Sequence, residues 1–192
     1  NFVFFLGIPL TLGVMSVAKT LVPWFLGEEF SLSVSILMTG SLLIIAKGFT
    51  DVAGVQYLIP SRNQAIFTKS VVTGAILNVV LNFILIPICG AIGAIIASVI
   101  AEVAIAIVQY YYVKKQINIQ IFTKAYLKYI VSGVLMFLTV YVMGIFMETT
   151  IITTILQICV GGIIYIGSLL IMKDKFLCER LDKILRTLKI KK

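Results

Sequence analysis

Long apolar runs constrain this chain more than any other feature of its sequence. A helix that crosses the hydrocarbon core of a bilayer needs about 20 mostly apolar residues. Six such runs occur, separated by polar residues, glycine or proline: residues 2–26, 32–59, 66–88, 90–112, 126–147 and 151–172. No water satisfies backbone groups in the hydrocarbon core, so each run is expected to be helical. We therefore expect an all-α, polytopic membrane helix bundle with about six transmembrane helices.

Composition supports a membrane protein and argues against an enzyme. The chain is 60% hydrophobic and 12% charged, whereas a soluble domain has about 25% charged residues. It contains no histidine, which removes the commonest general base and a common metal ligand. The three cysteines, Cys89, Cys159 and Cys178, have no metal-site or disulfide spacing. We expect free thiols, no cofactor and no bound metal.

The charged residues between the runs predict an orientation. One side of the expected bundle receives only Glu28, Glu29 and Glu148. The other receives the basic residues, which are Arg62, Lys69, Lys114, Lys115, Lys124, Lys128 and those of the tail 173–192. Short cytoplasmic loops are enriched in lysine and arginine, so both ends are expected on the cytoplasmic side of a plasma membrane. The net charge of +8 then reflects topology and contact with anionic membrane lipids, and we expect no nucleic-acid partner.

The chain divides into a transmembrane region, 1–172, and a basic tail, 173–192. The apolar residues of the tail lie at helical spacing, with lysine and arginine on the other face; they are Phe176, Leu177, Leu181, Ile184, Leu185 and Leu188. This pattern is typical of an amphipathic helix on the inner leaflet. A regulatory or partner-binding role is the alternative to a surface anchor. The chain begins without methionine inside an apolar run, so we expect a fragment of a longer protein.

Four ionisable residues fall inside the apolar runs: Lys19, Lys47, Asp51 and Glu102. Each costs about 2.5–3.5 kcal/mol at a helix centre, and such residues normally face a bundle interior or a water-filled cavity. Lys47 and Asp51 are four residues apart and therefore within ion-pair reach on one helix face. They form either a structural pair or a pair that lines a cavity.

Glu102 has no basic residue within one turn, so either its partner comes from another helix or it is protonated. It is a candidate for ion coupling or for a buried hydrogen bond. Lys19 lies in the outer half of the first run, where it either meets an anionic substrate or extends to the interface. Asn78 and Asn82 share a helix face and suit either interhelical hydrogen bonds or sugar hydroxyls.

Three segments resemble the Wzx-type polysaccharide repeat-unit flippases, which belong to the multidrug/oligosaccharidyl-lipid/polysaccharide exporter superfamily. The segments read LVPWFLGEEFSLS, GVQYLIPSRNQ and LNVVLNFILIPICGAIGAIIASVIAE. The third carries the strongest likeness, with a span ending at Pro87 followed by a glycine- and alanine-rich helix that holds Glu102. The likeness covers residues 2–115, and beyond them it rests on hydropathy and the number of spans.

This resemblance implies a MATE-like transporter of about fourteen helices, of which this chain supplies the C-terminal part and lacks the N-terminal half. It implies that undecaprenyl-diphosphate-linked oligosaccharide repeat units cross the bacterial plasma membrane, for capsule or other surface polysaccharide, by ion-coupled alternating access. Lys19 and Lys47 then suit the diphosphate or acidic sugars, and Asp51 and Glu102 suit coupling.

Three other functions are compatible with the same spans. A multidrug exporter of the superfamily needs an acidic cavity, whereas Lys19 and Lys47 here balance two acids. A membrane enzyme of glycan assembly needs catalytic groups on outer loops, and those loops are short and lack histidine. A structural scaffold has no need for Lys47, Asp51 and Glu102 in mid-membrane.

Overall fold

The structure is a computed structural model that describes residues 2–116 and 124–180. These residues are almost entirely helical and contain no strand. The elements are, in order, α1 (Phe2–Leu26), the 3₁₀ turn η1 (Glu28–Phe30), α2 (Ser31–Gly40), α3 (Leu42–Thr50), the π-helical segment η2 (Asp51–Leu58), α4 (Gln64–Gln116), α5 (Lys124–Phe146) and α6 (Ile151–Ile171). A further short helix, residues 175–180, follows α6.

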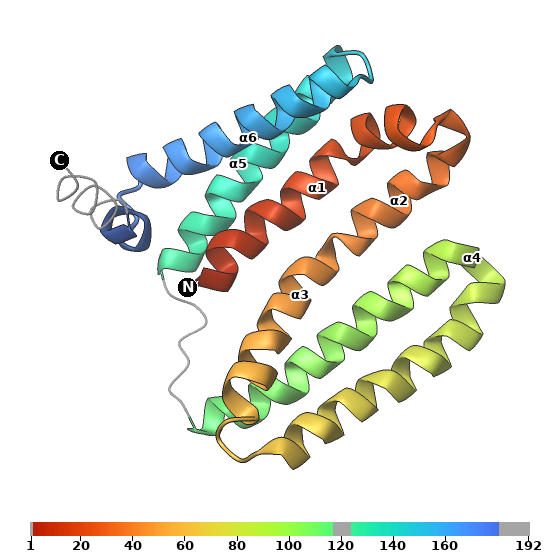
Figure 1. The fold of residues 1–192 in the computed structure, drawn as a ribbon, viewed down its shortest axis with the longest axis vertical. Coiled ribbons are helices and arrows are strands. Elements are labelled where there is room, and N and C mark those ends of the chain that lie inside the picture. Colours follow the sequence, from red (N-terminus) through yellow and green to blue (C-terminus); the bar gives the residue numbers. More distant parts are fainter. Residues whose placement is uncertain (1, 117–123, 181–192) are drawn as a thin grey trace, which may run out of the picture.

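The 53-residue α4 is a helical hairpin rather than one rod. A straight helix of that length would extend about 80 Å, but the chain reverses at Gly90, whose φ of 57° and ψ of −134° are not helical. The two limbs then run side by side (Figure 1). Gly93 permits the close return, because a Cβ there would lie 2.2 Å from the Leu85 carbonyl oxygen. The expected spans 66–88 and 90–112 correspond to these limbs.

Helices α2, α3 and η2 together form another run of membrane-spanning length, residues Glu28–Leu58. The run bends at Ser41, whose hydroxyl donates to the Met38 carbonyl at 2.7 Å. With α1, the α4 hairpin, α5 and α6, the described residues contain several helices that are long and apolar enough to cross a membrane. The expected all-α membrane bundle is confirmed at this level.

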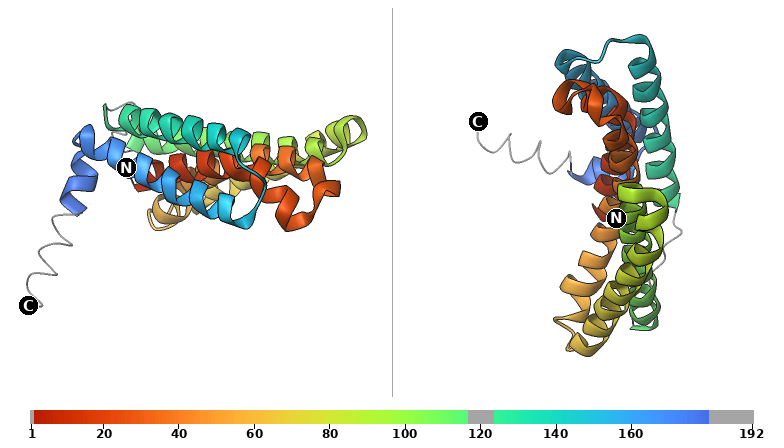
Figure 2. Two further views of the ribbon diagram at one scale, coloured as in Figure 1. Left: turned by 90° about the horizontal axis from the view of Figure 1, so that it is seen from above. Right: turned by 90° about the vertical axis from the view of Figure 1, so that its right-hand side faces the viewer.

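The helices pack as two groups that meet at α1. Helix α1 contacts α5 and α6 on one side and α2 and α3 on the other, and α2, α3 and η2 contact α4 (Figures 1 and 2). In the described residues α4 touches neither α5 nor α6. The main core lies among α1, α5 and α6, around Met136, Tyr165 and Leu169, and a smaller one around Leu58 and Val113 joins η2 to α4.

Large apolar side chains cover much of the outer surface. Phe83 is 79% exposed and Ile171 is 84% exposed. Bilayer lipid is as apolar as leucine, so this surface suits hydrocarbon. The structure and the apolar sequence agree on a multi-pass membrane protein.

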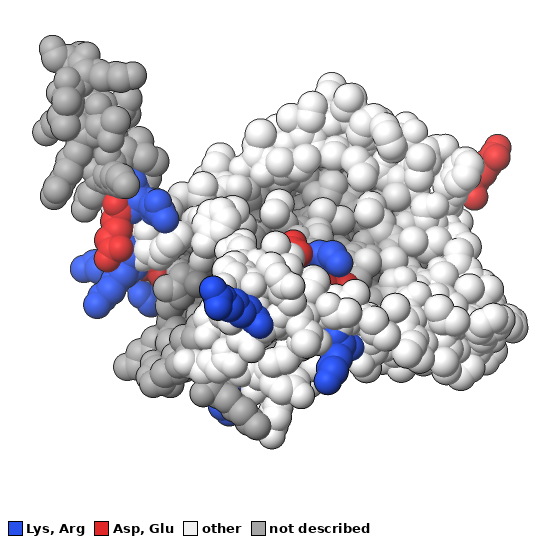
Figure 3. Space-filling model, turned by 60° about the horizontal axis from the view of Figure 1, so that its bottom comes forward, with Lys and Arg blue, Asp and Glu red and all other residues white. Residues whose placement is uncertain are grey.

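The two ends of the bundle differ in charge. The N-terminus of α1, the start of α5 and the end of α6 lie at one end, whereas the α1–α2 and α5–α6 turns lie at the other (Figure 1). The second end exposes Glu28, Glu29 and Glu148, and it appears red without blue in Figure 3. This arrangement agrees with an even number of spans. The cytoplasmic location of the basic end stays a prediction.

The first turn of the tail differs from the expected surface helix. The Leu177 side chain is buried in the core of α1, α5 and α6, and the Phe176 ring packs against Phe5, with centroids 5.3 Å apart. These two residues thus contact protein, because the chain turns back onto the bundle after α6. The remaining tail, 181–192, lies outside the described residues.

Candidate functional site

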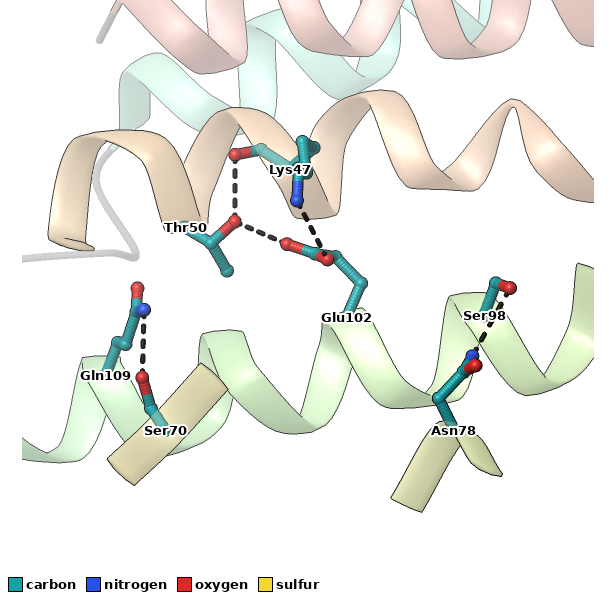
Figure 4. A network of polar contacts seen from close by, with 7 residues as sticks. All are labelled: Lys47, Thr50, Ser70, Asn78, Ser98, Glu102 and Gln109. Atoms are coloured by element: carbon teal, nitrogen blue, oxygen red, sulfur yellow. Dashed lines mark hydrogen bonds and ion pairs between the residues drawn. The ribbon is translucent and has the colours of Figure 1, made fainter. Parts of the chain in front are cut away.

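An ion pair joins the middle of two membrane-length helices. The Lys47 Nζ on α3 lies 3.3 Å from Glu102 Oε2 on the second limb of α4. Figure 4 shows Glu102 projecting from α4 toward Lys47 and Thr50. The expectation that the partner of Glu102 comes from another helix agrees with this geometry. Among the described residues it is the single ion pair.

Thr50 holds the other carboxylate oxygen. Its hydroxyl lies 2.5 Å from Glu102 Oε1 and 3.0 Å from the carbonyl oxygen of Lys47. One hydroxyl has one proton, and the ionised carboxylate is the stronger acceptor. Both oxygens of Glu102 therefore have a donor from α3, and Thr50 fixes the carboxylate beneath the lysine.

The two members of the pair differ in exposure. The Glu102 side chain is 12% exposed, whereas the Lys47 side chain is 63% exposed. An ammonium group has three N–H donors, and one of them faces Glu102. Lys47 thus retains N–H donors that do not face Glu102.

Asp51 is not the partner of Lys47, which corrects the pairing expected from their spacing. Asp51 is exposed and has no hydrogen bond or ion pair with any described residue. A largely buried carboxylate needs a counter-charge more than an exposed one does, because desolvation penalises its charge. Lys47 accordingly pairs with Glu102, and the π-helical segment that begins at Asp51 is a local irregularity of a kind often found at functional sites.

Lys19 lies apart from this pair. Its Nζ donates to the Tyr141 hydroxyl at 3.0 Å and stands 4.9 Å from the centre of that ring. Tyr141 belongs to α5, and α5 does not contact α4 in the described residues. Lys19 and Lys47 therefore have different side-chain partners, on α5 and α4 respectively.

Asn78 and Asn82 face the interior of the α4 hairpin. Asn82 donates to the Asn78 side chain at 2.8 Å. Asn78 donates to Ser98 on the opposite limb at 3.3 Å (Figure 4). The Asn78–Ser98 bond fits the interhelical alternative, whereas the Asn82–Asn78 bond lies within one limb. The hollow that Asn82 borders is otherwise lined by apolar side chains of the first limb, Val79, Phe83, Ile86 and Pro87, and it offers little to a sugar.

Several polar residues of the bundle escaped the sequence-based prediction. Gln157 is fully buried between α1 and α5, where it bonds Thr20 at 2.5 Å and the Val140 carbonyl at 3.0 Å. Gln109, also fully buried, donates to Ser70 at 3.1 Å across the hairpin. A glutamine inside an apolar run is the one signal that marks both positions.

The chemistry available is ionic and hydrogen-bonding. The described residues contain no group of three or more potential metal ligands. Lys47, Glu102 and Thr50 instead form a charged, partly exposed cluster held by one ion pair and one hydrogen bond between α3 and α4. Comparison with family models, with curated proteins and with solved structures finds no match to this chain.

Proposed function

We propose that this chain forms part of a transporter that moves undecaprenyl-diphosphate-linked oligosaccharide repeat units across the bacterial plasma membrane by ion-coupled alternating access. The observation that carries the proposal is the Lys47–Glu102 pair. Both residues lie well inside apolar helical runs of membrane-spanning length, and the lysine side chain is 63% exposed.

An exposed lysine in an apolar run is energetically unfavourable if its ammonium group faces hydrocarbon. Insertion scales assign about 2.5–3.5 kcal/mol to a lysine at a helix centre. The cost falls when the ammonium faces water or a polar partner, so the Lys47 side of α3 suits a polar cavity. A diphosphate is an anion and a strong hydrogen-bond acceptor, so it is a suitable partner for the Lys47 ammonium group.

Glu102 supplies the coupling group in this proposal. When a substrate diphosphate binds Lys47, the lysine no longer pairs with the Glu102 carboxylate. That carboxylate is 12% exposed, and Thr50 is then its remaining donor. An isolated charge at low exposure is unfavourable. Substrate binding at Lys47 therefore favours uptake of a cation or proton at Glu102.

One observation favours a second candidate, a multidrug cation exporter. Asp51 is exposed and has no partner among the described residues, and a cationic drug needs such an acidic group. Lys47 weakens this candidate, since it places a positive charge one turn away.

Variants of the full-length protein test the proposal in its host. Lys47→Ala and Glu102→Gln should reduce surface-polysaccharide export while membrane levels of the protein stay normal. Lys69→Ala removes an exposed lysine near the start of α4 and should leave export unchanged. Asp51→Ala separates the candidates, because loss of drug resistance with normal export would favour the cation exporter. Normal export in both Lys47→Ala and Glu102→Gln would contradict the proposed role of the pair.

A further inference from the structure

The chain leaves α6 through a closed turn at the basic end of the bundle. Lys173 adopts a left-handed conformation with a φ of 49°. The Asp174 amide then donates to the Leu169 carbonyl at 3.0 Å. From α5, the Lys128 ammonium donates to the carbonyls of Met172 at 2.6 Å and Lys173 at 3.2 Å. These bonds satisfy carbonyls that a helix end leaves free and place a cation at its negative pole.

Asp174 directs the short helix 175–180 that follows. Its side chain is nearly inaccessible, at 2% exposure. The carboxylate accepts the Leu177 amide at 3.0 Å, which caps the new helix, and the Tyr129 hydroxyl of α5 at 3.4 Å. The start of the tail is therefore held in a set direction relative to α5 and α6.

The apolar side chains of this helix pack against the rest of the protein. Leu177 lies in the core beside Tyr129 and Leu169, and Phe176 packs on Phe5. This contact decides which side of the helix faces outward. The exposed residues of this helix and of the turn before it are mostly basic: Lys173, Lys175, Glu179 and Arg180.

We propose that Lys173, Lys175 and Arg180 form a docking site for the headgroups of anionic phospholipids. The site lies directly after Ile171, where the apolar surface of α6 ends, and this is the depth of the headgroup region. Figure 3 shows basic side chains gathered around an acidic one beside the grey end of the chain. The guanidinium fork of Arg180 matches phosphate geometry.

Charge complementarity selects lipid as the occupant. Residues 173–192 contain eight lysines or arginines and three acidic residues, and basic segments next to a membrane helix attract anionic lipid. The fixed turn keeps the three outward charges at the surface on which the headgroups lie. The inference does not depend on the transported substrate.

The test measures lipid retention by the whole chain in mixed micelles that contain equal phosphatidylglycerol and phosphatidylcholine. Native mass spectrometry counts each bound lipid. The parent should retain phosphatidylglycerol preferentially. The triple variant Lys173→Gln, Lys175→Gln, Arg180→Gln should lose about fivefold in affinity for each charge removed. The matched control Arg62→Gln, Lys69→Gln, Lys114→Gln removes as much charge from the turn before α4 and from the two ends of α4, and it should lose less of the preference than the tail variant does.

Three results would overturn the inference. The parent retains both lipids equally, the control variant loses as much phosphatidylglycerol as the tail variant, or millimolar inorganic phosphate displaces the lipid completely. The last result would identify a site for soluble anions instead of a lipid surface. Glycan export by the variants is a separate readout, so a failure of the proposed transport function remains distinguishable.

Discussion

Substitution of two buried glutamines tests how much interhelical hydrogen bonds contribute to the stability of this bundle. Gln157 and Gln109 are both fully buried. Gln157 uses both ends of its amide, accepting from Thr20 and donating to the Val140 carbonyl. Gln109 donates to Ser70, but its Oε1 is buried without a partner among the described residues. Replacement of each by leucine keeps similar volume and removes the polar groups.

The expected effects differ in size and in sign. An interhelical side-chain hydrogen bond in a membrane protein contributes about 0.6 kcal/mol on average and up to about 1.7. Gln157→Leu loses two bonds, so it should lower the free energy of unfolding by about 1.2 kcal/mol. Gln109→Leu loses one bond but also removes an unpaired acceptor, whose burial costs about 1–3 kcal/mol. This variant should therefore be as stable as the parent or more stable.

Unfolding in mixed micelles with increasing dodecyl sulfate measures both variants. Trp24 is the single tryptophan, and its indole N–H donates to Thr154 on α6 at 2.8 Å. Its fluorescence therefore reports separation of α1 from α6. Equal destabilisation by Gln157→Leu and Gln109→Leu would refute the reasoning, because burial of the glutamine would then matter more than the number of bonds it makes.

Two further variants test the hairpin and the tail. Gly93→Val should abolish the folded, monodisperse protein in size-exclusion chromatography, because its Cβ would meet backbone at 2.2 Å, whereas Gly162→Val has open space and should fold normally. Asp174→Ala removes the side chain that caps the helix and accepts from Tyr129, so Cys178 should react faster with a maleimide once the other two cysteines are alanine. Glu179→Ala removes the same charge at an exposed position and should leave that rate unchanged.

Hydropathy predicted the spans because their length is set by the bilayer rather than by neighbouring helices. Gly90 was placed between two spans correctly, since Pro87 and glycine mark a break there. The third and fourth spans are nonetheless one helical hairpin with only a single non-helical residue. Such a short turn depends on the close backbone contact at Gly93, which no local pattern encodes.

The sequence analysis identified Lys47 and Glu102 as site residues, but it did not predict that they pair with each other. Spacing along a helix indicates only neighbours three or four residues away, so it linked Lys47 with Asp51. The observed partner, Glu102, is 55 residues distant, and Thr50 completes the contact. The packing of α3 against α4 brings these residues together, and a single sequence carries no signal for that packing.

In the tail too, the sequence pattern did not show what packs against the apolar residues. Helical spacing of Phe176 and Leu177 indicated an apolar face, and the structure covers that face with α1, α5 and α6. An amphipathic pattern records that a face is apolar, whereas it does not record whether protein or lipid covers it.

The measurement that tests the proposed function most directly is deletion of the gene in its host, followed by analysis of surface polysaccharide and of lipid-linked repeat units. The proposed function predicts loss of surface glycan together with repeat units trapped on the cytoplasmic face of the membrane. Intact surface glycan with new sensitivity to cationic drugs would contradict it and would assign the chain to multidrug export.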